Sequence, residues 1–199
     1  MIPVEAASDR RTHVLAICGS LRKRSFNRAL LVAASENAPQ GMTIEIVETL
    51  GTIPLFDEDL EQATGGGTHS VRLLRERVAK ADGVLIGTPE YNQSVPGVLK
   101  NAIDWLSRPA PDEVLSGKPV AIIGATGGPW GTRLSQTTLR QVLYATGSPV
   151  LPMPALFVRE AAKLIDDSGR LTDSRTLDQL RSLLNSFQRW ITLITGRST

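Results

Sequence analysis

Short apolar runs alternate with amphipathic segments along most of the chain. Three runs are almost continuously apolar, which is typical of strands buried on both faces of a parallel sheet. They are residues 13–18 (HVLAIC), 83–87 (GVLIG) and 119–124 (PVAIIG). Residues 43–48 (TIEIVE) alternate apolar and polar positions and predict a half-buried strand near a sheet edge. Residues 149–158 predict a last strand, and its interruption by Pro152 and Pro154 favours an edge position.

Apolar residues at helical spacing predict five helices between and after these strands. The predicted helices are residues 27–37, 69–80, 95–107, 132–145 and 177–194. Strict alternation of strands and helices predicts an α/β fold, with a doubly wound five-stranded parallel sheet and helices on both faces. Ligands of such folds bind at the carboxyl ends of strands, near the point where the strand order reverses. The loops after Cys18, Gly87 and Gly124 are therefore the candidate site.

The length of 199 residues predicts one domain over 1–199, with residues 1–12 and 195–199 as loose ends. Lys and Arg total 22 against 20 Asp and Glu, which argues against a nucleic-acid-binding protein. No apolar run approaches the ~20 residues that span a bilayer, and no apolar signal segment precedes residue 13. A single cysteine excludes an internal disulfide. We therefore expect a cytoplasmic protein without a membrane partner.

Few residues are suited to hold a metal ion. The chain has two histidines and one cysteine, so we expect no metal centre. Asp166, Asp167 and Asp173 do not follow the spacing of a calcium-binding loop. They predict a solvated acidic turn before the last helix.

The first candidate loop, residues 19–27 (GSLRKRSFN), joins a buried strand to a helix. It brings hydroxyl groups, three cationic side chains and the free N–H groups of a helix start together, which favours phosphate binding. The dinucleotide fingerprint G-x-G-x-x-G and the Walker A pattern are both missing. A small phosphate-bearing ligand therefore fits better than a nucleoside triphosphate.

The other two loops offer surfaces for a planar ring. Residues 88–97 (TPEYNQSVPG) hold Tyr91 between two prolines, and a rigid loop with an aromatic suits a flat, polar-edged ligand. Residues 124–132 (GATGGPWGT) contain glycines that let the backbone approach a ligand closely. Phosphate donors, an aromatic wall and close backbone together point to FMN.

These motifs also carry a family resemblance. GSLR at 19–22 with Ser25 and Asn27, PEYN at 89–92 and SVPGVLKNAIDWLSRP at 94–109 resemble the NAD(P)H-dependent FMN reductase family, nearest its chromate and quinone reductase branch. The resemblance covers about residues 13–190 and implies a flavodoxin-like sheet. It implies bound FMN and NAD(P)H as co-substrate, with two electrons passing through flavin N5 to an acceptor and no catalytic side chain.

The resemblance also assigns cofactor-binding residues by motif position. The residues implied for the 5′-phosphate are Ser20, Arg22, Ser25 and Asn27. Those implied for the isoalloxazine are Pro89, Glu90, Tyr91 and Asn92, largely through backbone groups and the tyrosine ring. Those implied for the pyrimidine edge are Thr126 and Gly127.

Acceptor and assembly follow from the same resemblance. It implies quinones or similar acceptors, with chromate, ferric chelates and azo or nitro compounds open, and it leaves the choice of NADH or NADPH open. It also implies dimers that often pair into tetramers. We expect the helix over 95–107 to contact a second copy, because Trp105 falls at the margin of its apolar stripe.

Two other functions remain open from the residues. Cys18, Arg24 and Ser25 match the C-x5-R-[ST] pattern of low-molecular-weight protein tyrosine phosphatases, in which a cysteine thiolate attacks phosphorus. The missing Asp-Pro acid and the unexplained loop over 88–97 count against this enzyme. A flavodoxin-type electron carrier would bind FMN without using pyridine nucleotides, but such carriers are typically strongly acidic.

Overall fold

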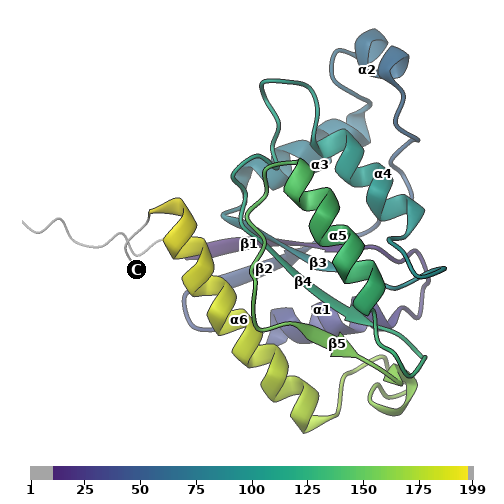
Figure 1. The fold of residues 1–199 in the computed structure, drawn as a ribbon, viewed down its shortest axis with the longest axis vertical. Helices are drawn as coiled ribbons and strands as arrows, with labels where there is room; N and C mark the ends of the chain where they lie inside the picture. Colours follow the sequence, from purple (N-terminus) through teal and green to yellow (C-terminus); the bar gives the residue numbers. More distant parts are fainter. Residues whose placement is uncertain (1–10, 197–199) are drawn as a thin grey trace, which may run out of the picture.

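Five strands form one parallel sheet in the order β2-β1-β3-β4-β5 (Figure 1). The structure, a computed structural model, describes residues 11–196. The strands are β1 (Thr12–Cys18), β2 (Met42–Ile46), β3 (Gly83–Gly87), β4 (Val120–Ala125) and β5 (Leu156–Val158). The chain runs from β1 outward to β2, then returns to the other side of β1 for β3. The predicted doubly wound α/β sheet is confirmed, and its strand order reverses between β1 and β3.

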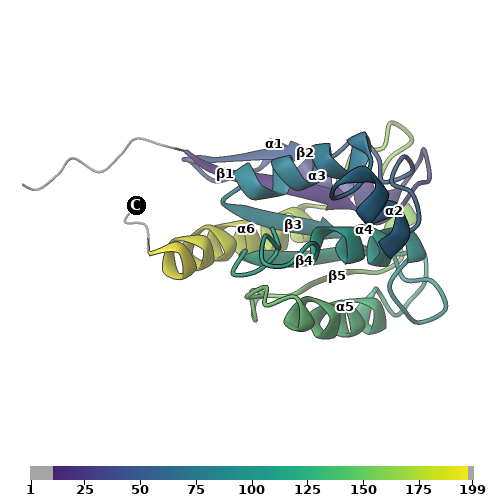
Figure 2. The same ribbon diagram turned by 90° about the horizontal axis from the view of Figure 1, so that it is seen from above.

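Helices cover both faces of this sheet (Figures 1 and 2). One face carries α1 (Phe26–Glu36) and α6 (Ser174–Thr195), and the other carries α3 (His69–Lys80), α4 (Gly97–Leu106) and α5 (Arg133–Ala145). Successive residues of a strand face opposite sides, so β1 contributes to two cores. Val14 and Ala16 pack with α1 and α6, whereas Leu15 and Ile17 pack under the other three helices.

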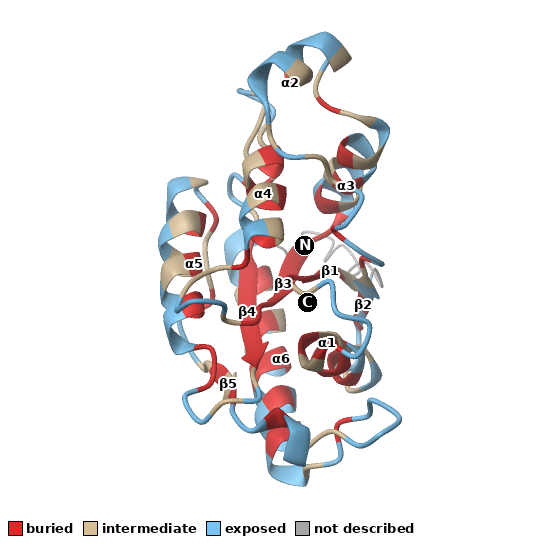
Figure 3. Cartoon of the chain, turned by 90° about the vertical axis from the view of Figure 1, so that its right-hand side faces the viewer, coloured by how far each residue is buried: buried red, intermediate tan, exposed pale blue. Residues whose placement is uncertain are grey.

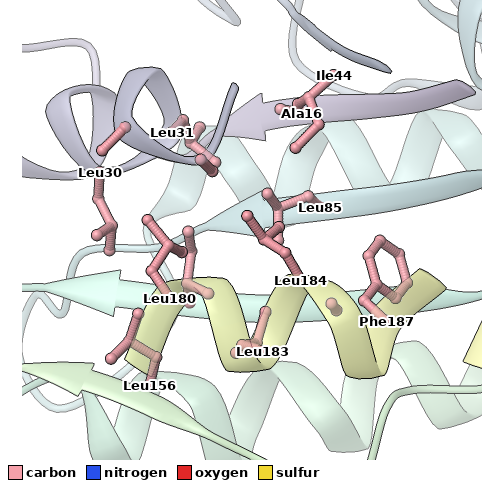
Figure 4. Packing of buried hydrophobic residues seen from close by; sticks show 14 of the residues in the cluster. Ala16, Leu30, Leu31, Ile44, Leu85, Leu156, Leu180, Leu183, Leu184 and Phe187 are labelled. Atoms are coloured by element: carbon pink, nitrogen blue, oxygen red, sulfur yellow. The ribbon is translucent and has the colours of Figure 1, made fainter. Parts of the chain in front are cut away.

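The core beneath α6 comes from one side of a long helix. Figure 4 shows Leu180, Leu184 and Phe187 on the side of α6 that faces Leu85 of β3. All four side chains are almost fully buried. Their spacing of three and four residues places them on one stripe of the helix, as the sequence pattern predicted.

The last predicted strand is split in two. Val150 forms an isolated bridge with Val120, and β5 itself begins only at Leu156. Pro152 and Pro154 lie between the two pairings and have no backbone N–H to donate to a neighbouring strand. The edge position that these prolines indicated is confirmed, but the strand is three residues long.

One helix was not predicted. α2 (Glu58–Thr64) stands away from the sheet between β2 and α3, and its surface is largely exposed (Figures 1 and 3). Only Glu61 of its seven residues is buried, so it lacks the apolar stripe that would have shown it in the sequence. Asp57 caps it by accepting hydrogen bonds from the N–H groups of Asp59 and Leu60.

The chain before α2 covers α4. The Trp105 indole is 1% exposed, and its Nε1 donates to the Pro54 carbonyl oxygen at 2.9 Å. The Phe56 ring meets the indole edge-on at 5.0 Å, and Asn101 of α4 exchanges hydrogen bonds with the same segment. Trp105 is therefore not available to a second copy, because its own subunit encloses it, and the expected contact of the helix over 95–107 with a second copy stays a prediction.

Both ends of the described chain lie at the amino-terminal side of the sheet (Figures 1 and 2). Thr12 belongs to β1 and Thr195 to α6, while the rest of the two predicted loose ends lies largely outside the described residues. Among the helices of residues 11–196, none is long and apolar enough to cross a bilayer.

Candidate functional site

The loops after β1, β3 and β4 meet at one edge of the sheet. This carboxyl-terminal edge lies on the right in Figure 1 and faces the viewer in Figure 3. Parallel strands end on the same side, so loops far apart in the sequence become neighbours there. The strand order reverses between β1 and β3, so the first two loops flank the position where such sheets bind ligands.

The loop after β1 ends in a capped helix start. Ser25 is the N-cap of α1, and its Oγ accepts a hydrogen bond from the Arg28 N–H at 3.3 Å. Within residues 11–196, the N–H groups of Phe26 and Asn27 have no hydrogen-bond acceptor. They lie at the positive end of an eleven-residue helix, which favours a bound anion.

Cationic side chains surround this helix start. Arg22, Lys23 and Arg24 are exposed, and the Arg22 guanidinium lies 5.6 Å from the centre of the Phe26 ring. Arg24 instead reaches the 159–173 loop, where it donates to the Asp167 carbonyl oxygen at 3.3 Å. The positive charge needed for a dianionic phosphate is therefore present, with Arg24 already engaged elsewhere.

Asn27 connects two of the three loops. Its Nδ2 donates to the Ala125 carbonyl oxygen at 2.8 Å, and its Oδ1 accepts from the Ala125 N–H at 2.9 Å. Ala125 of β4 lies beyond Ile123, the last residue of β4 that pairs with β3. The Asn27 side chain therefore takes the place of a backbone partner in β3. The amide is buried, and both its oxygen and its nitrogen already bond to Ala125, whereas the backbone N–H of Asn27 has no acceptor within residues 11–196 and is available to a phosphate.

The loop after β3 is a tight hairpin. Tyr91 and Ser94 exchange backbone hydrogen bonds of 3.3 and 3.0 Å across Asn92 and Gln93. Both central residues have left-handed backbone angles, with φ of 49° and 62°, as a two-residue hairpin turn of type I′ requires. The loop over 88–97 thus contains a closed two-residue turn, and Tyr91 stands 49% exposed on it.

Glu90 fixes this hairpin to α5. Its Oε2 accepts hydrogen bonds from the N–H groups of Leu134 and Ser135, at 2.9 and 3.0 Å. Thr132, the residue that precedes α5, makes no side-chain cap, so the carboxylate of a distant residue satisfies the helix start. Sequence reasoning missed this contact, because the partners are 44 residues apart.

The loop after β4 leaves space beside its backbone. A Cβ on Gly127 would meet no atom closer than the Phe26 ring at 3.8 Å, and a Cβ on Gly128 none closer than 3.9 Å. Packing within residues 11–196 therefore does not require either glycine. The Gly128 N–H donates to Thr126 Oγ1 at 3.3 Å, which shapes the turn.

The three loops together fit FMN. Unpaired N–H groups and cations suit a 5′-phosphate, an exposed tyrosine on a stiff hairpin suits a planar ring, and two glycines beside open space admit a ring edge. The loops are also tied together by Asn27 and Glu90 rather than only adjacent. Preorganised groups of this kind lose little freedom when a ligand binds.

Cys18 does not fit a phosphatase nucleophile. Burial raises the pKa of its thiol, and hydrogen-bond contacts with the Ser20 backbone and the Ser25 hydroxyl, together with the charge of Arg28, offset this only in part. A phosphatase needs the opposite shift, because the thiolate is the attacking form. Arg24, the arginine of the matched pattern, points to Asp167 instead.

Replacing Cys18 with serine should leave flavin binding and NAD(P)H oxidation within about twofold of the original protein, since a buried thiol acts as a small apolar group. Steady-state oxidation of NADH at saturating quinone measures this. The original thiol should also react slowly with a disulfide reagent until the chain is unfolded. Hydrolysis of p-nitrophenyl phosphate that disappears in Cys18→Ser would contradict the assignment.

Two other groups considered from the sequence have structural partners. Asp166 accepts from the Ser168 hydroxyl and the Arg170 N–H, and Asp173 caps α6 by accepting from the Thr176 N–H at 2.8 Å. These contacts account for the acidic turn before the last helix.

Comparison with known proteins agrees with this geometry. A family model described as NADPH-dependent FMN reductase matches residues 12–163. The NAD(P)H-dependent FMN reductase PA1204 of Pseudomonas aeruginosa is 42% identical over 183 residues, which cover 92% of this chain and 97% of that protein. A quinone reductase of Pseudomonas putida is 40% identical over 180 residues, 90% of this chain and 95% of that protein.

A solved structure resembles the whole fold. The flavoenzyme NAD(P)H:(acceptor) oxidoreductase FerB from Paracoccus denitrificans superposes with a TM-score of 0.83 at 34% sequence identity. The match covers 92% of this chain and 98% of that one. The flavodoxin-like arrangement expected from the sequence is thereby confirmed.

Proposed function

Because the chain belongs to the NADPH-dependent FMN reductase family, we propose that the loops after β1, β3 and β4 bind FMN and that quinones are its electron acceptors. The protein is an NAD(P)H-dependent flavin oxidoreductase. The observation that carries the site is the capped start of α1, where unpaired N–H groups and cations face the same edge as Tyr91.

The β1–α1 loop holds the phosphate in this proposal. Ser20, Arg22 and Ser25 contribute from their side chains, and Asn27 contributes through its backbone N–H. Besides accepting from the Arg28 N–H, the Ser25 hydroxyl makes only a long contact of 3.9 Å with Cys18 Sγ among the described residues, from which it can turn to donate to a phosphate. A phosphate dianion at this place gains from the helix dipole and from charge-assisted hydrogen bonds together.

The other two loops hold the ring. Pro89, Asn92 and the Glu90 backbone line it, while the Glu90 carboxylate keeps the hairpin on α5. The exposed face of Tyr91 covers part of the ring. Thr126 and Gly127 approach its pyrimidine edge from the open side of the β4–α5 turn.

When bound, FMN supplies the two-electron carrier between the nicotinamide and the acceptor. The chain's own residues bind and orient the reactants and exclude competing reactions, and no side chain is assigned as acid or base. Chromate, ferric chelates and azo or nitro compounds are further candidate acceptors. The proposal includes a cytoplasmic location, because the reaction consumes reduced nicotinamide nucleotides.

Flavin identification tests this function. We expect purified protein to carry FMN, to be reduced anaerobically by NADH or NADPH, and to turn over with benzoquinone. Protein that is colourless and does not take up added FMN would overturn the proposal. Protein that binds FMN but does not oxidise either nicotinamide would instead be a flavodoxin-type electron carrier.

We also propose self-association as a dimer that includes the helix over 95–107. Leu55 is 82% exposed although it lies in the segment that Asn101 of α4 binds, and a second copy would cover it. Leu55→Glu should convert the dimer to monomer by light scattering at about 10 µM, because a charge buried at an interface is costly. Leu73→Glu, an exposed position on α3, is the control. Original protein that is monomeric would refute the proposal.

A further inference from the structure

A groove of about 1010 Å³ follows the outer edge of β5. Its walls come from the β4–α5 loop, from β5 and the residues after it, and from the first turn of α6. It shares Pro129 and Trp130 with the β4–α5 loop, two and three residues beyond Gly127. None of the cofactor-binding residues proposed above lines it.

Three arginines line this groove without a carboxylate partner. Arg133, Arg159 and Arg175 are exposed, and none forms an ion pair within 4.0 Å in the described part of the chain. Arg133 begins α5, Arg159 follows β5 and Arg175 belongs to α6, so the three arginines become neighbours only in the folded chain. Guanidinium groups are well suited to phosphate, which they bind through two parallel hydrogen bonds.

The two carboxylates in the groove are already engaged. Glu160 Oε1 pairs with Lys163 at 2.6 Å, and Asp173 Oδ2 accepts from the Thr176 N–H and hydroxyl. These hydrogen bonds are the main reason that the pKa values of Glu160 and Asp173 are lowered, and the charges of Arg159 and Arg175 contribute least. The groove therefore keeps a surplus of positive charge for a ligand.

The same groove has an aromatic wall. Trp130 lines the groove and is 80% exposed, which is unusual for so large an apolar side chain. Arg133 lies over the Phe157 ring, with the guanidinium carbon 5.2 Å from the ring centre. This contact restrains Arg133 while its N–H groups stay free to donate in their own plane.

We propose that this groove binds the adenosine 2′-phosphate end of NADPH. Trp130 stacks on the adenine, and Arg159 and Arg175 bind the 2′-phosphate. Arg133, the first residue of α5, binds the diphosphate. A terminal phosphate dianion is the group that NADPH has and NADH lacks, so the groove favours NADPH.

The proposal rests on the flavin site proposed above, because the nicotinamide must reach the flavin while the adenosine lies here. β5 is two strands from β3 in the sheet. Neighbouring strands are about 4.8 Å apart, so β5 lies about 10 Å from β3, the strand that leads into the hairpin of Tyr91. An extended dinucleotide spans that distance.

The test compares the two nicotinamides in FMN-loaded enzyme. Arg159→Gln/Arg175→Gln should raise KM for NADPH by about tenfold or more and leave KM for NADH and both kcat values within about twofold, because only the 2′-phosphate loses its partners. Arg189→Gln removes an exposed arginine of α6 outside the groove and should change neither KM. Flavin content and melting temperature confirm that all variants are loaded and folded.

A binding measurement makes the test independent of turnover. Adenosine 2′,5′-bisphosphate should bind the original enzyme with a quench of tryptophan fluorescence, should be displaced by inorganic phosphate, and should bind the double variant about tenfold more weakly. Trp130→Phe should remove the quench and keep the binding. Equal changes in KM for NADH and NADPH, or unaltered binding to the double variant, would overturn the groove assignment while the flavin-dependent NADH oxidation stands.

Discussion

Replacing Asn27 with alanine should lower the free energy of unfolding by about 3 kcal/mol, because the N–H and carbonyl of Ala125 would both lose their partner inside the protein. The side chain is only 2% exposed, so water does not readily replace it. Urea denaturation of FMN-free protein measures the loss without the added stability that a bound cofactor gives.

The same substitution should weaken FMN binding by about tenfold, because Asn27 holds the phosphate loop against the loop that approaches the pyrimidine edge. Asn185→Ala is the matched control, since within residues 11–196 that exposed amide donates only to the Arg181 carbonyl oxygen. We expect the control to change stability by less than about 0.5 kcal/mol. If both variants unfold at the same urea concentration as the original protein, Asn27 does not join the loops energetically.

The buried strands and the helices that pack on them were predictable because burial leaves a periodic trace. β3 and α3 have the predicted bounds, and the alternation of residues 43–48 correctly indicated the edge strand β2. Apolar side chains at these positions gain most of their stabilisation from leaving water, so the pattern survives in a single sequence. The position proposed for the site follows from topology, since the carboxyl ends of parallel strands share an edge.

Contacts between distant polar residues left no such trace. Asn27 is separated from Ala125 by 98 residues, and the hydrogen-bonding groups of each could have found many other partners. The family resemblance implied a phosphate-binding role for Asn27 and gave no sign that its amide also serves as a strand partner. Likewise, Trp105 sat at the margin of an apolar stripe, and the segment before α2 that encloses it has no periodic signal of its own.

Gly124→Ala should destabilise the protein by about 3 kcal/mol, because a close-packed site with no room for a methyl group must move its neighbours. A Cβ there would overlap the Thr132 hydroxyl oxygen and lie 2.6 Å from the Thr88 carbonyl oxygen. Hydrogen bonds restrain both of these neighbouring residues. Thr132 Oγ1 accepts from the Gln136 side chain, and the Thr88 N–H is bonded to the Ile123 carbonyl oxygen.

The matched control is Gly97→Ala at the start of α4, where a Cβ meets nothing within 4 Å. There the helix favours alanine over glycine, so we expect a gain of about 0.5 kcal/mol. Thr88 and Thr132 lead into two of the flavin loops, so Gly124→Ala should also lower FMN affinity, which fluorescence titration of the FMN-free protein measures. Equal urea midpoints for the two variants would show that the protein accommodates a methyl group at Gly124 without a loss of stability. Close packing at Gly124 would then not be what holds the flavin loops in place.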